Sequence, residues 1–291
     1  MDTPRIDLVL PSLRCPVCTE SLTREERTVR CPGGHRFDLA RQGHLTLLRG
    51  GGRAGQGDTA DMVAARAAFL EHGHYAPIAE ALTQAVAAVP AVTDDGAPLL
   101  LDLAGGTGYY LAAVLDTLPS AVGVDLELST YAARRAARAH PRMAAVRADV
   151  WQRLPVATGS AAAVLSVFGP RNAPEIARVL AEEGRLVVVA PDQDHLRELV
   201  GPLGMLAVAP DKAERLTRQL AEFTAVDEQV LRYRADMSRA DVTHEVLMGP
   251  SAHHVDRAAL TAAVTGLTEP VGVTVSVTVT SYRAGRVPAP R

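Results

Sequence analysis

The chain has 291 residues, of which 47% are apolar and 22% charged, and its formal net charge is −3. This length is sufficient for two domains, and no apolar run is long enough to cross a membrane. The N-terminus, with Asp2 and Asp7, lacks the basic region and apolar stretch of a signal peptide, so we predict a cytoplasmic protein. The mild acidity argues against nucleic acid as a partner, but the charge is distributed unevenly along the chain.

All the cysteines of the chain lie in its N-terminal segment. Two residues separate Cys15 from Cys18, twelve separate Cys18 from Cys31, and three separate Cys31 from His35. Buried thiols, or a disulfide with one cysteine left over, are the alternatives, but such cysteines would rarely fall at this spacing with a histidine after them. Three thiolates and one imidazole suit a tetrahedral Zn²⁺ ion with no open position. We therefore predict a structural zinc site.

The same segment is locally basic. Between residues 24 and 53, seven arginines stand against three acidic residues, a local excess of four positive charges. Both a solvated surface and a patch that contacts phosphate are compatible with this excess. We expect residues 1–50 to form a zinc ribbon of short strands and turns, and the glycine run 50–52 to end it.

Residues 51–96 are predicted to form a helical linker. Thr59, which has acidic neighbours, resembles a helix N-cap, and apolar residues recur at helical spacing over 62–70. A second helix is expected over 77–89, because Pro90 cannot continue it.

From residue 98 onward, short apolar runs alternate with helical segments, which is typical of an open parallel sheet covered by helices. Two later segments, 224–237 and 274–282, are expected to form an antiparallel pair at one edge of this sheet, and a helix over 241–249 is expected to line a substrate cleft. The fold class predicted for residues 97–291 is therefore α/β, with a Rossmann-like core of seven strands. Its parallel strands are expected at 99–103, 121–125, 144–149, 162–168 and 185–190.

Acidic residues stand at the ends of three predicted parallel strands. In doubly wound sheets the ligand lies beyond the carboxyl ends of the strands. Asp102 lies near the end of the first strand. Asp125 ends the second strand and can accept hydrogen bonds from both ribose hydroxyl groups. Asp149 follows the third strand, where an adenine amino group would lie. A strand-end acid is common in any α/β protein, so these positions carry meaning only in combination.

A glycine-rich turn, 104–108, follows the first strand and opens a helix. Gly106, Thr107 and Gly108 would let the backbone approach a ligand closely. NAD enzymes share this arrangement, but their pattern of glycines at positions 1, 3 and 6 fails here, because the sixth position from Gly106 is Leu111. We therefore predict S-adenosylmethionine as the cofactor.

Three stretches of the chain resemble the large-subunit ribosomal RNA guanine-N1 methyltransferases, including members that confer resistance to tylosin-type macrolides. The resemblance extends from the cysteine array through the Rossmann-like core. The third stretch is absent from zinc ribbons and methyltransferases in general. The stretches are LRCPxC at 13–18, CxxxHxFDxARxG at 31–43 and GDTxDMxxARxxFLxxGHY at 57–75.

The resemblance implies a zinc module that recognises an RNA hairpin, in many members within a homodimer. It also implies methyl transfer from S-adenosylmethionine to N1 of a guanine in the hairpin 35 region of 23S ribosomal RNA, near the macrolide site in the peptide exit tunnel. By the same resemblance, Cys15, Cys18, Cys31 and His35 are the metal ligands, Asp125 is the ribose acid, and Tyr75, Gly106, Thr107 and His195 contact S-adenosylmethionine.

The chain departs from the family in two places. Ala104 stands where the family commonly has glycine, and we expect it to be tolerated if its φ angle is negative. The loop 168–172 lacks the usual aromatic lead-in and is expected to flank the target base. Trp151 is compatible with covering the adenine or with core packing.

Two other functions compete with this interpretation. A small-molecule methyltransferase of macrolide biosynthesis would share the core but would not need a basic zinc ribbon. A non-enzymatic zinc-containing adaptor with a decayed methyltransferase domain is the second alternative, suggested by Ala104. No feature of the sequence identifies a general base.

Overall fold

The computed structural model describes residues 5–49, 57–93 and 97–285. The glycine run 50–52, where we expected the ribbon to end, lies outside these residues.

The main sheet contains the seven predicted strands in the order β10-β11-β9-β8-β5-β6-β7, and the short strand β4 extends it beyond β7. Strands β5 to β9 are parallel to one another, and β11 is antiparallel to both β9 and β10. The expected α/β core is therefore confirmed, with an eighth strand that the sequence analysis did not anticipate. The strands are β4 (Leu45–Thr46), β5 (Leu99–Leu103), β6 (Val122–Glu127), β7 (Met143–Arg147), β8 (Ala161–Val167), β9 (Leu180–Pro191), β10 (Phe223–Met237) and β11 (Val271–Ala284).

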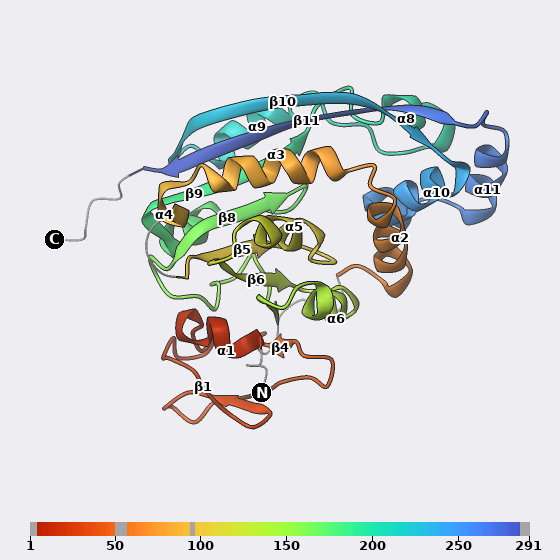
Figure 1. The fold of residues 1–291 in the computed structure, drawn as a ribbon. Helices are drawn as coiled ribbons and strands as arrows, with labels where there is room; N and C mark the ends of the chain where they lie inside the picture. The colour runs from red at the N-terminus through yellow and green to blue at the C-terminus, as the bar shows by residue number, and fades with distance from the viewer. Residues whose placement is uncertain (1–4, 50–56, 94–96, 286–291) are drawn as a thin grey trace.

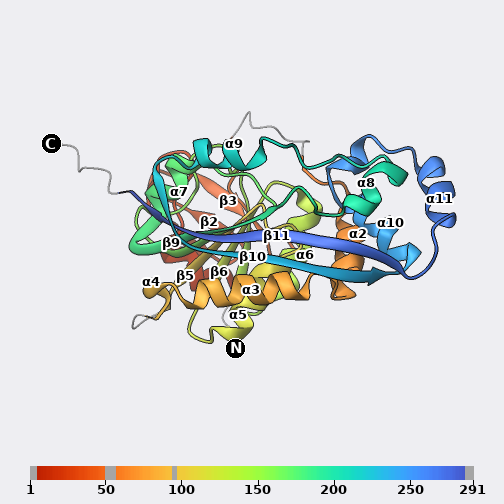
Figure 2. The same cartoon turned by 90° about the horizontal axis from the view of Figure 1, so that it is seen from above.

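Helices cover both faces of the sheet, which is why its central strands are apolar on both sides. Along β5, Leu100 packs into one hydrophobic cluster, and Leu101 and Leu103 pack into the other. Figure 2 shows α3 and α9 on opposite sides of the long strands β10 and β11. The first face carries α3 (Ala76–Ala87), α5 (Tyr109–Thr117) and α6 (Thr130–Ala139), and the second carries α1 (Arg5–Val9), η1 (Leu10–Ser12), α7 (Ala173–Val179) and α9 (Lys212–Gln219).

A group of helices gathers beyond the carboxyl ends of the parallel strands (Figure 1). Helix α2 packs against α10, although the two are far apart in the sequence. Their starts are well defined, because Thr59 caps α2 and Ser238 forms a reciprocal capping box with Asp241 in α10. This group consists of α2 (Ala60–Glu71), α8 (Arg197–Leu203), α10 (Arg239–Met248), η2 (Pro250–His253) and α11 (Arg257–Thr265), whereas α4 (Pro90–Thr93) lies at the opposite end of the sheet.

The N-terminal segment forms a small antiparallel sheet that is attached to the main one. Its strands are β1 (Thr23–Glu25), β2 (Thr28–Arg30) and β3 (Arg36–Asp38). Leu13 forms a bridge with Val156, and Leu45 in β4 pairs with Val146 in β7. These contacts place the buried apolar residues of the ribbon in the same hydrophobic cluster as one face of the main sheet.

Within the part of the chain that the structure describes, every helix is too short or too polar to span a bilayer.

Candidate functional site

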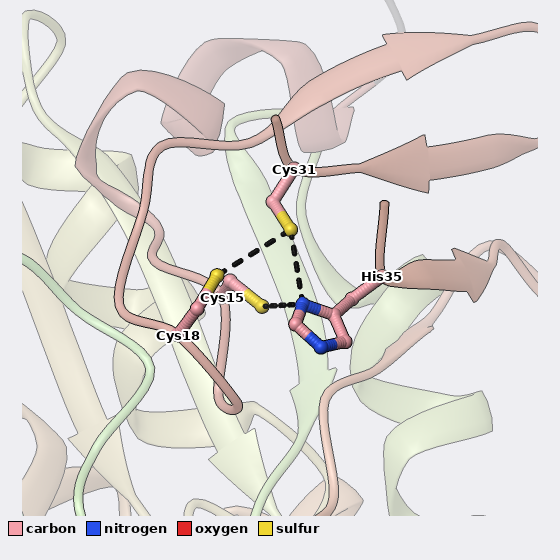
Figure 3. Close-up of side chains that lie close together, drawn as sticks. All are labelled: Cys15, Cys18, Cys31 and His35. Carbon is pink, nitrogen blue, oxygen red and sulfur yellow. Dashed lines mark hydrogen bonds between the residues drawn. The ribbon is translucent and has the colours of Figure 1, made fainter. Parts of the chain in front are cut away.

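The four residues predicted as metal ligands converge on one point, and Figure 3 shows their side chains pointing toward one another. Their ligand atoms all lie within 4.8 Å of one another. The Nδ1 atom of His35 is 3.2 Å from Cys31 Sγ and 3.6 Å from Cys15 Sγ, and the Sγ atoms of Cys18 and Cys31 are 3.5 Å apart. Three sulfur atoms and one nitrogen at these separations fit a single tetrahedral Zn²⁺ ion.

Two tight turns bring these ligands together. The Thr19 amide donates to the Cys15 carbonyl at 2.9 Å, and the Gly34 amide donates to the Cys31 carbonyl at 3.0 Å. Gly34 has a φ angle of 83°, which glycine adopts without steric cost. Each turn therefore holds its ligands in place by local backbone geometry.

Three carboxylates form a buried cluster beneath the glycine-rich turn. Asp102 and Asp125 are register partners on β5 and β6, only 1% and 0% exposed, and Glu127 lies on the same face of β6 two residues later. A Cβ atom at Gly105 would lie 2.6 Å from Asp102 Oδ2 and would also collide with Asp125 Oδ2. Both aspartates therefore point at the backbone of the turn, which is approachable there only because residue 105 is glycine.

The cluster has an excess of negative charge. Burial, followed by the charge of Glu127, raises the pKa of Asp102 to about 7. Burial and the charges of Asp102 and Glu127 raise the pKa of Asp125, and burial raises the pKa of Glu127. Glu127 accepts hydrogen bonds from the amides of Gly106 at 3.0 Å and Ser129 at 2.8 Å.

Among the described residues, neither oxygen of Asp102 or of Asp125 has a hydrogen-bond partner. Buried polar atoms are rarely left unpaired, so the four oxygens indicate a ligand that brings donors or positive charge. The ribose hydroxyl groups and the sulfonium of S-adenosylmethionine have these properties, so the residues fit this cofactor. Sequence reasoning missed Glu127, although its two-residue separation from Asp125 predicts that both point to one face of the strand.

In the glycine-rich turn, the condition that we set for Ala104 is not met. Ala104 has a φ angle of +56°, not a negative one, and its amide donates to the Leu126 carbonyl at 2.8 Å. The left-handed conformation costs a residue with a Cβ atom roughly 1–2 kcal/mol, which the surrounding turn must offset. Gly106 and Gly108 also have positive φ angles, and Gly108 caps the start of α5.

Aromatic residues lie together beyond the ends of β8 and β9. Tyr75 precedes α3, Phe168 follows β8 and His195 follows β9, and their ring centroids are between 5.8 and 6.1 Å apart. The Tyr75 hydroxyl is 3.4 Å from His195 Nε2 and donates to Glu245 on α10 at 3.1 Å. The structure thus brings together two predicted residues, Tyr75 and His195. Sequence reasoning missed Glu245, which no motif marks because it enters from a distant helix.

Asp149 and Trp151 lie together in the turn that follows β7. Asp149 accepts hydrogen bonds from the Trp151 amide at 3.0 Å and from the Gln152 side chain at 3.3 Å, so its carboxylate stabilises its own turn. Trp151 is 58% exposed, which excludes core packing.

A cavity of about 630 Å³ opens between the start of α2, the turn after β6 and the end of α10. Asp58, Ser129, Arg147 and Arg257 are among its lining residues. None of the predicted cofactor residues lines it, so the acidic cluster and this cavity are separate features.

Comparison with known proteins gives consistent results for the ribbon and for the chain as a whole. A family model described as "RlmA, N-terminal", a zinc ribbon, matches residues 13–49. A putative 23S rRNA (guanine-N(1)-)-methyltransferase of Micromonospora griseorubida is 47% identical, over 94% of this chain and 98% of that protein. The 23S rRNA (guanine(748)-N(1))-methyltransferase of Streptomyces fradiae has the same identity and coverage.

Among solved structures, a complex of the Haloferax volcanii Trm112 methyltransferase activator with a putative methyltransferase aligns at a TM-score of 0.48 and 18% identity. The alignment covers 79% of this chain and 99% of that one.

We predict that the purified protein contains about one zinc ion per chain and that Cys31→Ser lowers its thermal stability, because structural zinc supplies folding free energy. Since the ribbon shares a hydrophobic cluster with the sheet, the loss should extend to the main unfolding transition. Elemental analysis and calorimetry measure both effects, and Ser21→Ala, in the same ribbon, serves as the control. Metal-free protein with intact thiols would contradict the prediction.

We also predict a pH-dependent effect of Asp102→Asn on the ligand-free protein. Because the pKa of Asp102 is raised to about 7, the folded state binds more protons than the unfolded state from about pH 4 to 7, and stability falls as the pH rises. Asparagine removes this loss. The difference in unfolding free energy between the variant and wild type should therefore increase from pH 5 to pH 8 by on the order of 1–3 kcal/mol. Urea unfolding at several pH values measures this difference. A difference that does not change with pH would refute the raised pKa.

Proposed function

The chain belongs to the family of 23S ribosomal RNA (guanine-N1)-methyltransferases, and from this premise we propose that it methylates N1 of a guanine in the hairpin 35 region. It is an enzyme that uses S-adenosylmethionine as the methyl donor and carries a structural zinc ion. The adaptor alternative loses its support, because the relatives that share 47% identity with the chain over nearly its whole length are described as methyltransferases. The small-molecule alternative leaves the basic zinc ribbon without a role.

The observation that carries the proposal is the pair of unpartnered carboxylates beneath the turn 104–108. We assign the ribose of S-adenosylmethionine to Asp125 and the backbone contacts to the turn at Gly106 and Thr107. Asp102 and Glu127 supply the negative potential that favours a cationic ligand over a neutral one. Asp149 remains a proposed neighbour of the adenine.

The aromatic group supports a place for the target base. N1 of guanine carries a proton and becomes nucleophilic only as that proton leaves. The enzyme must therefore extrude the base, align N1 with the activated methyl group that S-adenosylmethionine supplies, and provide a proton acceptor. Phe168 is 38% exposed and has a φ angle of +54°. A partly exposed aromatic ring beside Tyr75 and His195, on a residue whose backbone is held in the left-handed conformation, suits stacking with an extruded base.

The charges of the ribbon support an RNA-binding surface. Arg24 pairs with Asp7 and Arg30 pairs with Glu25, so these cations are already partly neutralised. Arg36 and Arg41 are exposed, and among the described residues neither has an ion-pair partner. We assign phosphate contacts to these two arginines.

Helix α6 extends this surface beyond the ribbon. A Cβ atom at Gly43 would lie 3.8 Å from Ala137 Cβ, so the loop that contains Arg41 packs against α6. Four alanines of α6 are buried and its arginines are exposed. We therefore propose that RNA contacts both the ribbon and the outward arginines of α6, which are Arg134, Arg135 and Arg138.

Finer assignments follow from the same premise. We propose guanine 748 as the target, reduced macrolide binding as the consequence, and the cytoplasm as the site of action. We also propose a homodimer, which the edge strand β10, with Val226 and Val230 exposed, supports.

We predict that 23S ribosomal RNA from cells that express the protein stops primer extension one nucleotide before guanine 748, because an N1 methyl group blocks base pairing. RNA from cells without the gene, and from cells with the Asp125→Asn variant, should be read through. A stop at a neighbouring guanine would overturn only the position, whereas read-through in every sample would overturn the proposed function.

We predict that reversing Arg36 and Arg41 to glutamate weakens binding of a hairpin 35 transcript and flattens its salt dependence. Removing one arginine–phosphate interaction should reduce the slope of log affinity against log salt by about one unit. Reversing Arg215 and Arg218 on α9 makes the same change in net charge and should leave the slope intact. Fluorescence anisotropy at several salt concentrations measures the slopes. Equal slopes for wild type and the ribbon variant would mean that these arginines do not contact RNA.

A further inference from the structure

Glu245 is a buried acid that none of the assignments above uses. It lies on α10 and is 6% exposed, and burial raises its pKa to about 7. Its Oε1 atom accepts a hydrogen bond from the Tyr75 hydroxyl at 3.1 Å, whereas Oε2 has no partner among the described residues. One oxygen of this buried carboxylate is therefore available to a ligand.

A chain of hydrogen bonds determines which oxygen of Glu245 is already occupied. The Ser276 amide donates to His195 Nδ1 at 3.3 Å, so the imidazole proton belongs on Nε2. His195 Nε2 can then donate to the Tyr75 oxygen at 3.4 Å, and the Tyr75 hydroxyl donates onward to Glu245. Burial and the charge of Lys212 lower the pKa of His195 to about 4, which keeps the imidazole neutral. The network leaves Glu245 Oε2 as a free acceptor.

A positive charge lies against the glycine-rich turn. A Cβ atom at Gly106 would be 2.8 Å from Arg66 Nη1, so the guanidinium lies directly against the turn. Arg66 also pairs with Asp58 and donates to the Met248 carbonyl at 2.7 Å. Its charge acts on Glu245, but no ion pair joins the two within the described residues.

We propose that Glu245 and Arg66 recognise the amino-acid end of S-adenosylmethionine, with Glu245 Oε2 accepting from the α-ammonium group and Arg66 donating to the carboxylate. This inference rests on the proposed function and deepens it. The cofactor carries an ammonium and a carboxylate on one carbon atom. The chain presents a carboxylate oxygen without a partner on Glu245 and a guanidinium against Gly106, and the charge of that guanidinium acts on Glu245. Asp125 serves the other end of the cofactor, so the two ends have separate recognition residues.

The role of a proton acceptor for guanine fits Glu245 less well. Its carboxylate is enclosed by Tyr75 and α10, whereas Phe168, which we assign to the base, is partly exposed. A group that takes a proton from the target must come within hydrogen-bonding reach of it.

The test compares two ligands that differ only in the part we assign. S-Adenosylhomocysteine keeps the amino acid, and 5′-methylthioadenosine lacks it. We expect Glu245→Gln to weaken binding of S-adenosylhomocysteine by about tenfold or more, because a charge-assisted hydrogen bond is lost, and to leave binding of 5′-methylthioadenosine unchanged. Isothermal titration calorimetry on the full chain measures both. Asp125→Asn should weaken both ligands, and Glu80→Gln, on the exposed face of α3, should weaken neither.

Arg66 is tested with a third ligand, decarboxylated S-adenosylhomocysteine. Arg66→Gln should weaken S-adenosylhomocysteine but not this analogue, whereas Glu245→Gln should weaken both, because the analogue keeps the ammonium. Thermal unfolding of each variant verifies that it is folded.

Two results would overturn the inference. Equal weakening of S-adenosylhomocysteine and 5′-methylthioadenosine by Glu245→Gln would give Glu245 a purely structural role. Unchanged binding of both, with slower methyl transfer, would instead indicate a role toward the guanine. Failure of the proposed function looks different, because the wild-type protein would then bind none of these ligands and leave guanine 748 unmodified.

Discussion

Asp102, Asp125 and Glu127 hold three carboxylates on one face of two neighbouring strands, out of reach of bulk water. Such a cluster is costly unless its members are protonated, hydrogen-bonded or paired with a cation. The raised pKa of Asp102 and the two amides that bind Glu127 relieve only part of that cost. The turn above the cluster completes the site, because residue 105 has no side chain and Ala104 accepts a left-handed conformation. Affinity for a cationic ligand thus follows from an arrangement that is unfavourable without one.

The site is assembled from segments that are distant in the sequence. The Rossmann-like core supplies the turn and the acids, whereas α2, α10 and the residue before α3 supply Arg66, Glu245 and Tyr75. Helices α2 and α10 pack against each other beyond the carboxyl edge of the sheet (Figure 1). A displacement of α10 would therefore alter the Tyr75 network without changing the core.

The sequence alone predicted those features that depend on residues close together in the chain. The spacing of Cys15, Cys18, Cys31 and His35 predicted a cluster that the structure contains, because two short turns determine it. Alternating apolar segments predicted the seven core strands for a similar reason. Glu245 and Arg66 could not be predicted, since their importance depends on how distant helices pack. The positive φ angle of Ala104 could not be predicted either, because the hydrogen bond to Leu126 that holds the turn comes from another strand.

Strand β4 has a consequence for how the two modules can be studied. It consists of only Leu45 and Thr46, but it pairs with β7. The backbone amide of Leu47 then donates to the carbonyl of Arg147. Removing the ribbon together with β4 would therefore leave the backbone groups at the edge of β7 unpaired. It would also expose the apolar surface under the ribbon to water. Bare strand edges recruit other chains and promote aggregation. The ribbon consequently covers one edge and one apolar surface of the catalytic sheet. Loss of activity in a truncated enzyme would therefore reflect aggregation before it reflected the loss of RNA recognition.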